Sequence, residues 1–479
     1  MFNMKIAFVA AESKPLIKTG GLGDVIESLA KEETKLGEEV IIIIPFYKKI
    51  RSNSHYTFSK ILSYSVNLSW RKEEVEVYET KIDDVIFYLI YNERYFNREA
   101  IYGEFDDGER FAFFTLAAKE LFHLISYQPD IIHIHDWHVG MLPVIVKESN
   151  DENEYLKNAK FVLTIHNPAF QGLYPKTILG DFYNLSDSVF ENGKVRFKGQ
   201  VSTLKAGIIY ADKITTVSSN HRLELLSSEG GMGLDTVLKL REWDFEGIVN
   251  GIDYDEFNPL TDKYIEFKYD EKSFLKAKEK NKDNLLRKMK LVNTGKPLFG
   301  IVSRLTWQKG MDLFLAMAYS LAKNGCNIVI LGSGEYNLEQ EMEKLRSTYP
   351  NTVGIYIGFN NELAHQIYAS CDFFLMPSLF EPCGIGQLIA ERYGALPIVR
   401  LTGGLKDTVI NFDGNNQNIS NGFGFSNYSN DEAIRTAFYA YDNYWNLPLR
   451  SQLIYNAMTT DNSWEKSAKK YIQLYKTLI

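Results

Sequence analysis

Short runs of apolar residues, many of them β-branched or aromatic, alternate along the chain with stretches of helical character. The runs are nearly all apolar, which is typical of strands buried on both faces of a parallel sheet. They lie at residues 5–11, 40–45, 86–91, 131–135, 160–165 and 213–217, and then at residues 298–303, 327–331, 353–357, 372–376 and 396–400. This alternation of strands and helices predicts an α/β protein.

The 479 residues exceed what one ordinary hydrophobic core uses, so we expect more than one domain. A charged, helix-prone stretch at residues 270–290 separates the two sets of runs, and the turn residues Asn250-Gly-Ile-Asp253 precede it. We therefore place a boundary near residue 250, with one domain over residues 1–248 and a second over residues 249–460.

Composition narrows the class of protein. The net charge of −8 argues against a general nucleic-acid binder, which would be basic. The three cysteines are too few and too odd in number for a disulfide scaffold, which favours a reducing compartment. The N-terminus lacks the features of a signal peptide, and no apolar run reaches the roughly 18–20 residues that span a bilayer. We expect a cytoplasmic protein that binds neither nucleic acid nor membrane.

A glycine-rich loop, Lys18-Thr-Gly-Gly-Leu-Gly-Asp24, follows the first apolar run and precedes a helical stretch. Such a turn exposes backbone N–H groups and the positive end of a helix dipole, which together bind anions. It is not a dinucleotide fingerprint, because Ile26 stands where the third glycine belongs. The loop is either a phosphate site assisted by Lys18 or a tight turn with a solvated lysine.

A second loop of this kind, Phe380-Glu-Pro-Cys-Gly-Ile-Gly-Gln387, follows the run at residues 372–376. Two such turns in separate halves predict two α/β domains that act on one phosphorylated ligand. Glu381 is placed to bond sugar hydroxyls or to steady positive charge, although an N-cap role is the alternative. Arg304 and Lys309 follow the run at residues 298–303. The planar guanidinium of Arg304 and the ammonium of Lys309 together suit a diphosphate. The alternative is a basic turn exposed to solvent.

Histidines gather at His133-Ile-His135-Asp136-Trp137-His138. A metal site is the less favoured interpretation, because no partner ligands with zinc-type spacing follow. Thr164-Ile-His166-Asn167 ends the next run in the same way, and in open α/β sheets the carboxyl ends of strands line the ligand crevice. We therefore expect a ligand site there. Asp253-Tyr-Asp255 resembles a metal-binding D-x-D, but we interpret it as a turn.

With these residues assembled, the chain resembles the bacterial-type glycogen and starch synthases, which are retaining glycosyltransferases of the GT-B fold. The resemblance covers nearly the whole chain. Its motifs are Lys18-Thr-Gly-Gly-Leu22, His135-Asp-Trp-His138, Thr164-Ile-His-Asn167, Leu204-Lys-Ala-Gly207, Ala211-Asp-Lys213, Asn250-Gly-Ile-Asp253, Ser303-Arg-Leu-Thr306, Gln308-Lys-Gly310, Glu381-Pro-Cys-Gly384, Thr402-Gly-Gly-Leu405 and Ser463-Trp464.

The resemblance implies two Rossmann-like α/β domains that face each other across a deep cleft. The first, over residues 1–248, would be the starch synthase catalytic domain on the acceptor side. The second, over residues 249–460, would be a group 1 glycosyltransferase domain that holds the nucleotide sugar. The terminal segment, residues 461–479, would be a helix that packs back on the first domain.

The activity implied by the resemblance is transfer of glucose from ADP-glucose to the non-reducing end of an α-1,4-glucan, either glycogen or a maltooligosaccharide, with retention of configuration and without a metal or other cofactor. The residues implied as catalytic are Glu381, Asp136, Arg304 and Lys309. Those implied to bind the donor are Lys18, Gly20, Gly21, His166, Asn250, Arg304, Lys309, Cys383, Gly384, Gly386 and Gln387. Those implied to bind the acceptor are Glu12, Asp24, Tyr95 and Asn167.

The chain departs from the family pattern at four places, one of them two residues long. Ile385-Gly386 replaces the usual Leu-Thr or Leu-Ser, Gly230 a usual Tyr, Ser202 a usual Asn and Asn97 a usual Asp. These departures bear on acceptor preference and rate more than on donor chemistry. Two alternatives therefore remain: another GT-B glucosyltransferase with a different donor or acceptor, and a non-catalytic glucan-binding relative.

Overall fold

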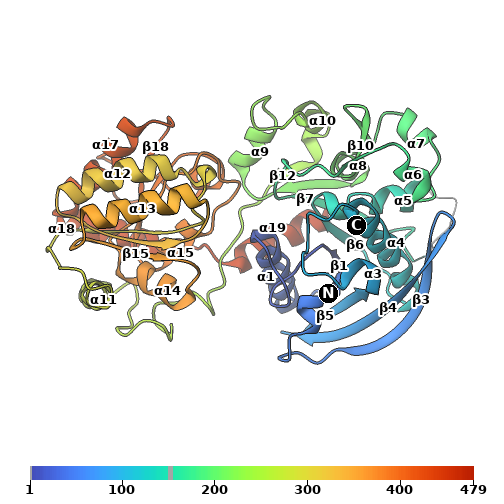
Figure 1. The fold of residues 1–479 in the computed structure, drawn as a ribbon, viewed down its shortest axis with the longest axis horizontal. Coiled ribbons are helices and arrows are strands. Elements are labelled where there is room, and N and C mark those ends of the chain that lie inside the picture. The colour runs from blue at the N-terminus through green and yellow to red at the C-terminus, as the bar shows by residue number, and fades with distance from the viewer. Residues whose placement is uncertain (1–2, 149–154) are drawn as a thin grey trace. The chain divides into compact units, whose positions relative to one another are not determined.

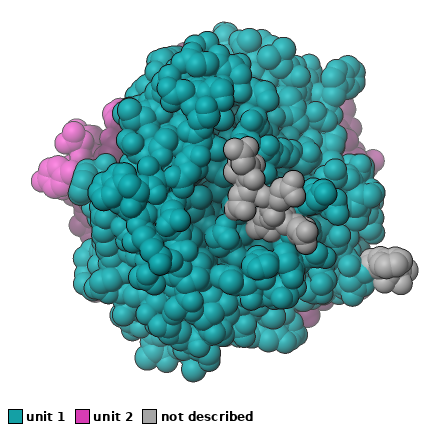
Figure 2. Space-filling view, turned by 90° about the vertical axis from the view of Figure 1, so that its right-hand side faces the viewer, with its two compact units in different colours: residues 1–217, 222–248, 464–479 teal, residues 218–221, 249–463 magenta. Residues whose placement is uncertain are grey.

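The computed structural model describes residues 3–148 and 155–479 and divides into two compact units (Figure 1). Unit 1 comprises Met1–Val217, Arg222–Ile248 and Trp464–Ile479, and unit 2 comprises Ser218–His221 and Val249–Ser463. Figure 2 colours unit 1 teal and unit 2 magenta. These bounds differ in two places from the division expected from the sequence. Residues 461–463 belong to unit 2, and Ser218–His221 also group with unit 2.

Unit 1 is built on a nine-stranded sheet of order β12-β11-β7-β6-β1-β2-β5-β4-β3. The pairs from β12 to β5 are parallel, whereas β5–β4 and β4–β3 are antiparallel. The strands are β1 (Lys5–Val9), β2 (Glu39–Pro45), β3 (Ser59–Leu68), β4 (Arg71–Ile82), β5 (Val85–Tyr91), β6 (Ile131–His135), β7 (Lys160–Ile165), β11 (Lys213–Thr216) and β12 (Phe245–Gly247).

Apart from the short β12, the parallel strands of unit 1 coincide with the predicted apolar runs, and strands such as β1, β2, β6 and β7 bury nearly every side chain. The long β3–β4 hairpin was not predicted. Its residues alternate between buried and partly exposed positions, so it lacks a continuous apolar run. Continuous apolar runs identify strands that are buried on both faces, so they do not reveal an antiparallel hairpin with one face exposed to solvent.

Helices cover the sheet of unit 1 (Figure 1). They are α1 (Gly21–Lys35), α4 (Asp107–Leu124), α5 (Leu142–Glu148), α8 (Thr203–Tyr210), α10 (Asp235–Leu240) and α19 (Trp464–Lys476), with the one-turn helices α2 (Lys48–Arg51), α3 (Glu93–Phe96), α6 (Ile178–Asp181) and α7 (Ser188–Glu191). Helix α9 (Ser219–Leu225) is divided between the units, because its first residues group with unit 2. A small antiparallel sheet joins β8 (Leu173–Tyr174), β10 (Gln200–Ser202) and β9 (Arg196–Phe197). The C-terminal helix α19 packs against α1, at the opposite end of the sequence.

Unit 2 contains a six-stranded parallel sheet of order β15-β14-β13-β16-β17-β18. Its strands are β13 (Leu298–Val302), β14 (Asn327–Gly332), β15 (Val353–Ile357), β16 (Phe373–Met376), β17 (Leu396–Arg400) and β18 (Phe423–Phe425). Its helices are α11 (Phe274–Lys288), α12 (Met311–Lys323), α13 (Tyr336–Thr348), α14 (Asn361–Ser370), α15 (Gly386–Arg392), α16 (Gly403–Thr408), α17 (Asn430–Tyr444) and α18 (Leu447–Thr459). The predicted α/β class is confirmed.

Each unit has its own hydrophobic core, built from the sheet and the helices that cover it. The apolar face of α19 belongs to the core of unit 1, where Trp464, Ala468 and Tyr471 are buried. In the part of the chain that the structure describes, no helix combines the length and the apolar character needed to cross a membrane.

Candidate functional site

Strand order explains where the predicted site residues gather. In unit 1 the chain leaves β1 toward β2 on one side and β6 toward β7 on the other, so the order reverses between β1 and β6. In unit 2 the same reversal lies between β13 and β16. Loops diverge at such a point and leave a crevice outside the carboxyl ends of the strands. These four strands are followed by the first glycine loop, by Asp136, by Arg304 with Lys309, and by the loop that carries Glu381. His166 and Asn167 follow β7, Asn250 follows β12 and Tyr95 follows β5.

The glycine loop of unit 1 is held by a buried carboxylate, that of Glu12. Its Oε2 accepts hydrogen bonds from the backbone N–H and the hydroxyl of Thr19, both at 2.8 Å, and its Oε1 accepts one from Gly23 N at 3.2 Å. These bonds satisfy a carboxylate that is only 1% exposed. Acceptor binding by Glu12 stays a prediction; in this structure its carboxylate oxygens hold the loop through hydrogen bonds to Thr19 and Gly23.

Lys18 and Asp24 face each other across the same loop. The Lys18 ammonium lies 2.9 Å from Oδ1 of Asp24, and both side chains are at least partly exposed. Between them, Gly20 and Gly21 are open: a Cβ at either position would meet no atom of the described residues within 4 Å. The loop therefore leaves room for an anion at the N-terminus of α1. Asp24, expected at the acceptor, here neutralises the lysine.

Asp136 follows β6 in a backbone conformation that residues other than glycine rarely adopt, with φ +56° and ψ −167°. Its Oδ1 accepts hydrogen bonds from the backbone N–H groups of His166 at 2.8 Å and Asn167 at 3.4 Å. Burial, with a small contribution from the nearby Glu12, raises the pKa of this carboxyl to about 7, although the hydrogen bonds from His166 and Asn167 act in the opposite direction. Strain of this kind costs about 1–3 kcal/mol and clusters at functional sites, and a pKa shifted by burial in a crevice marks a candidate for chemistry.

The histidines of β6 form hydrogen bonds to other side chains. His133 contacts the Thr164 hydroxyl through Nε2 at 2.6 Å, and Nδ1 of His135 lies 3.0 Å from Nε2 of His166. Burial lowers the pKa of His166 to about 3, so its ring is neutral at pH 7. Among residues 3–148 and 155–479, no group of three or more His, Cys, Asp or Glu side chains has the arrangement of a metal site.

The D-x-D sequence makes a local turn, as interpreted from the sequence. The backbone N–H of Asp255 donates to Oδ1 of Asp253 at 2.7 Å. This bond is the usual way in which an aspartate side chain closes a turn two residues long.

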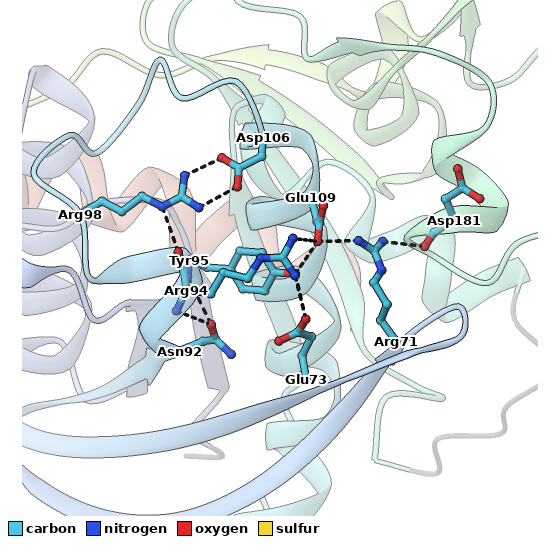
Figure 3. Close-up of polar contacts among 9 residues, drawn as sticks. All are labelled: Arg71, Glu73, Asn92, Arg94, Tyr95, Arg98, Asp106, Glu109 and Asp181. Atoms are coloured by element: carbon cyan, nitrogen blue, oxygen red, sulfur yellow. Dashed lines mark hydrogen bonds and ion pairs between the residues drawn. The ribbon is translucent and has the colours of Figure 1, made fainter.

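Tyr95 lies in a polar network rather than on a binding surface (Figure 3). Its side chain is 0% exposed, and its hydroxyl donates to Oε1 of Glu109 at 2.6 Å. The same oxygen receives Arg71 at 2.6 Å and Arg94 at 3.1 Å. Burial and Glu109 raise the pKa of Tyr95 far above its usual value. Contact with the acceptor stays a prediction for Tyr95, whose ring is buried in this structure.

The main ion pair of the unit 2 site joins Lys309 and Glu381. The Lys309 ammonium lies 2.6 Å from Oε2 of Glu381, which also accepts a hydrogen bond from the Ser378 hydroxyl at 3.0 Å. Both charged side chains are mostly buried, so their attraction is screened less than at the surface. Gly310 allows this approach: it has φ +67°, and a Cβ there would lie 1.9 Å from the Pro377 carbonyl oxygen.

Arg304 presents the free cation of this site. It is exposed, and its guanidinium forms no ion pair with any residue of the described part of the chain. Arg304 lies two residues after the end of β13 and five residues before Lys309. One cation is thus held in place by a carboxylate while another remains available to a ligand.

The second glycine loop is closed by Gln387, which is 0% exposed. Its amide donates to the carbonyl oxygens of Cys383 at 3.1 Å and Gly384 at 3.0 Å. The thiol of Cys383 accepts a hydrogen bond from the backbone of Asn250, and burial raises the pKa of that thiol to about 12. Asn250 is thereby brought beside the loop. At the end of this loop, Gly386 is the first residue of the short helix α15.

Two residues that support Glu381 were not among the predicted site residues, although Gly403 lies in the motif Thr402-Gly-Gly-Leu405. Arg400, at the end of β17, donates to the Ser378 carbonyl oxygen at 2.9 Å and so holds the loop that carries Glu381. At Gly403, with φ +45°, a Cβ would lie 1.9 Å from the Glu381 carbonyl oxygen. An arginine at a strand end is the same signal that singled out Arg304, and it was available for Arg400.

Comparison with known proteins bears on what this arrangement does. The chain is 44% identical to a glycogen synthase of Clostridium kluyveri over 99% of its own length and 100% of that protein. It is 42% identical to a glycogen synthase of Bacillus cereus over 99% and 100% of the two chains. The chain belongs to the bacterial glycogen synthase family. Its members are glycosyltransferases, and so is this chain.

Further similarities agree with the glycogen synthase family. The family model of the starch synthase catalytic domain matches residues 5–240, and that of glycosyl transferases group 1 matches residues 282–460. The catalytic domain of starch synthase IV from Arabidopsis thaliana, bound to ADP and acarbose, superposes with a TM-score of 0.91 at 30% identity, over 100% of this chain and 99% of that one. Sucrose-phosphate synthase from Thermosynechococcus elongatus, at 14% identity and a TM-score of 0.61, shares the fold alone. The predicted GT-B fold is confirmed.

Proposed function

We propose that this chain transfers glucose from ADP-glucose to the non-reducing end of an α-1,4-glucan, with retention of configuration and without a metal ion or other cofactor. The observation that carries the proposal is the mostly buried Lys309–Glu381 pair in the same strand-end segment as the exposed Arg304, which has no ion-pair partner among the described residues. It combines two cations suited to a diphosphate with a carboxylate suited to a sugar. The 44% identical relatives named glycogen synthase and the neighbour bound to ADP and acarbose support this donor and acceptor.

The cations of unit 2 would stabilise the negative charge that grows on the departing diphosphate. Glu381 holds the Lys309 ammonium at 2.6 Å, so no reorganisation is needed when the charge develops. Arg304, free of internal partners among the described residues, would supply the planar fork. The loop closed by Gln387, with Asn250, Cys383, Gly384 and Gly386, would lie along the same phosphates.

Unit 1 would provide the groups around the transferred glucose. The open backbone at Gly20 and Gly21, next to Lys18, suits a phosphate or a sugar hydroxyl. Asp136 and the neutral imidazole of His166 lie at the next strand ends and offer an acceptor and a donor to hydroxyls. Asn167, fixed beside them, remains the acceptor-side residue.

Retention of configuration has two possible routes. Retaining glycosidases use a nucleophilic carboxylate about 5–5.5 Å from a second one. The sequence offers no obvious pair for that role, so we propose a front-face displacement. The leaving phosphate accepts the proton of the acceptor hydroxyl as the bond to the anomeric carbon breaks, and Arg304 and Lys309 stabilise the resulting charge. Glu381 would favour the positive charge at the anomeric carbon.

We place the reaction in the cytoplasm. The three cysteines, Cys326, Cys371 and Cys383, are buried free thiols, as in a reducing compartment. Glycogen or a maltooligosaccharide would be the partner there, and neither nucleic acid nor membrane is part of the proposal.

A donor panel tests the proposed function. Purified protein is incubated with glycogen and radiolabelled ADP-glucose or UDP-glucose, and incorporation into insoluble glucan is followed with and without EDTA. We expect a higher kcat/KM with ADP-glucose and full activity in EDTA. A preference for UDP-glucose would assign another donor, and loss of activity in EDTA that Mg²⁺ restores would assign a metal. Glycogen binding without turnover on any donor would favour the non-catalytic alternative.

A further inference from the structure

The ring of His166 is held by a second histidine, His135, which has no part of its own in the proposed transfer. His135 is the last residue of β6 and is fully buried. Its Nδ1 lies 3.0 Å from Nε2 of His166, the residue that directly follows β7. A group proposed to face the ligand is therefore bonded from behind by a buried imidazole.

The pairing of β6 with β7 brings these two rings together. The strands run parallel, with His133 opposite Val162 and His135 opposite Thr164. Each of these histidines bonds the side chain two residues beyond its register partner, which lies on the same face of the sheet. His133 bonds the Thr164 hydroxyl at 2.6 Å, and His135 bonds His166. The contact therefore follows from the register of two central strands rather than from a loop.

The two rings share a single hydrogen. Burial lowers the pKa of His166 to about 3 and lowers the pKa of His135 well below its usual range, so both rings are neutral at pH 7. A neutral imidazole carries its hydrogen on one nitrogen and accepts through the other. The hydrogen of the 3.0 Å contact therefore sits either on Nδ1 of His135 or on Nε2 of His166. Whichever nitrogen carries it also fixes the tautomer of both rings.

The far nitrogen of His135 distinguishes the two arrangements. Nε2 of His135 is buried and has no hydrogen-bond partner among residues 3–148 and 155–479, and the ring stacks on His133 and Phe8. With the shared hydrogen on His166, His135 would carry a buried N–H without an acceptor, and unpaired buried N–H groups are the rarer kind in folded proteins. With the hydrogen on Nδ1 of His135, the buried Nε2 is a bare ring nitrogen, and His166 carries its own hydrogen on Nδ1.

We propose that His135 is a positioning residue, which donates through Nδ1 to Nε2 of His166 and so holds His166 in the tautomer whose Nδ1–H donates to a hydroxyl of the transferred glucose. The inference rests on the proposed function for the identity of this ligand. His166 is partly exposed, and the contact with His135 occupies its Nε2, so Nδ1 is the nitrogen left for a ligand.

Asp136, the neighbour of His135, completes the arrangement. Its Oδ1 accepts the backbone N–H of His166 at 2.8 Å, so two adjacent residues hold the backbone and the ring of the same histidine. An ionised carboxylate can only accept hydrogen bonds, whereas a sugar hydroxyl both donates and accepts. The Nδ1–H of His166 therefore supplies the donor that Asp136 lacks. The opposite tautomer would present acceptors alone.

NMR of the full-length protein, labelled with ¹⁵N in its histidine rings, observes the shared hydrogen directly. Long-range ¹H–¹⁵N spectra distinguish the protonated from the bare nitrogen of each ring, and the exposed rings of His55 and His123 serve as the reference. We expect hydrogen on Nδ1 of both His135 and His166. Hydrogen on Nε2 of both rings, or exchange between the two tautomers as in an exposed ring, would overturn the proposal.

Three substitutions of His135 separate donation from mere packing. In His135→Asn an amide N–H takes the place of the Nδ1–H, in His135→Asp that place holds an acceptor, and in His135→Leu it holds neither. We expect His135→Asp and His135→Leu to lower kcat by about 10–100-fold, the range for removing a partner that orients a ligand-binding histidine. His135→Asn should stay close to the parent, and His135→Asp should move the hydrogen of His166 to Nε2.

The affinity for ADP, which has no glucose, should be unchanged in all three variants. His123→Asn, an exposed histidine of the same unit, is the matched control and should behave like the parent. Equal losses of kcat in all three variants, or parent-like kcat in His135→Leu, would show that the ring of His135 only fills space, and the proposal would be wrong.

Two further outcomes have a defined meaning. If a variant does not fold, the spectrum of the parent still gives the answer, because it needs no substitution. If the parent showed the expected tautomers but transferred no glucose from any nucleotide sugar, the proposed function would fail while the positioning of His166 by His135 stood. The spectrum is recorded without donor or acceptor, so the two failures are distinguishable.

Discussion

The hydroxyl of Tyr475 lies 2.7 Å from Nδ1 of His133, and this bond joins the C-terminal helix α19 to the strand that leads to Asp136. The other ring nitrogen of His133 bonds Thr164, and the ring stacks on His135 with centroids 4.2 Å apart. Burial lowers the pKa of His133 well below its usual value, so the ring is neutral and each nitrogen needs its own partner. The C-terminal helix α19 thus helps to hold β6, the strand that precedes Asp136.

Tyr475→Phe is expected to destabilise unit 1. The change removes one partner of a fully buried imidazole, and such a loss costs about 1–3 kcal/mol. Urea unfolding measures the effect, with Tyr455→Phe as the control because that ring is partly exposed in unit 2. Equal stability of the two variants would show that the Tyr475–His133 bond contributes nothing.

Arg304→Ala and Lys309→Ala are both expected to lower kcat by about 10²–10³-fold, the range for removing one donor that stabilises developing negative charge. They should differ in stability. Lys309→Ala leaves the mostly buried Glu381 without its cation and should cost about 1–3 kcal/mol, whereas the exposed Arg304 has no ion pair to lose among the described residues.

Steady-state kinetics with ADP-glucose and thermal unfolding measure these two effects separately. Turnover within threefold of the parent in either variant would remove that residue from the diphosphate site. Equal melting temperatures of the two variants would show that the Lys309–Glu381 pair is not stabilising.

Glu381→Gln is expected to lower kcat far more than the affinity for ADP. The amide keeps the size of the side chain but loses the charge that favours a cationic anomeric carbon, and ADP has no glucose to respond to that loss. Calorimetric titration with ADP and initial rates with ADP-glucose give the two quantities. Glu362→Gln, on the exposed surface of unit 2, is the control. A parallel loss of ADP binding and of kcat would favour a capping role for Glu381.

Asp136→Asn is expected to weaken the pH dependence of stability. The pKa of Asp136 is raised to about 7 in the folded chain from an ordinary value of about 3.8, so the folded state binds the proton more tightly. The free energy of unfolding therefore falls as pH rises from about 4 to about 7, since stability decreases wherever the native state holds more protons. Other buried carboxyls, such as Glu33 and Glu391, act in the same direction.

The measurement is urea unfolding at pH 5 and pH 7.5 for the parent and for Asp136→Asn. Both proteins keep the other buried carboxyls, so their difference isolates Asp136. We expect the parent to lose more stability than the variant between the two pH values. An identical loss would mean that the pKa of Asp136 is not raised.

Much of the fold and part of the site follow from the sequence. An apolar run such as residues 131–135 becomes a parallel strand because both of its faces must leave water, and that requirement is local. Polar residues that follow such a run, such as Asp136 or Lys309, must lie at the carboxyl edge of the sheet. The type of residue and its position after a predicted strand were sufficient to identify Asp136 and Lys309 as candidates.

Other features were decided by the tertiary structure. Glu12 and Tyr95 are inside because distant segments, Thr19 to Gly23 and Glu109, bring donors or acceptors to them. His135 reaches His166 only because β6 and β7 pair in parallel. Tyr475 reaches His133 across 342 positions of sequence. No local pattern records such partners, because they are selected by which surfaces the packed sheet and helices bring together.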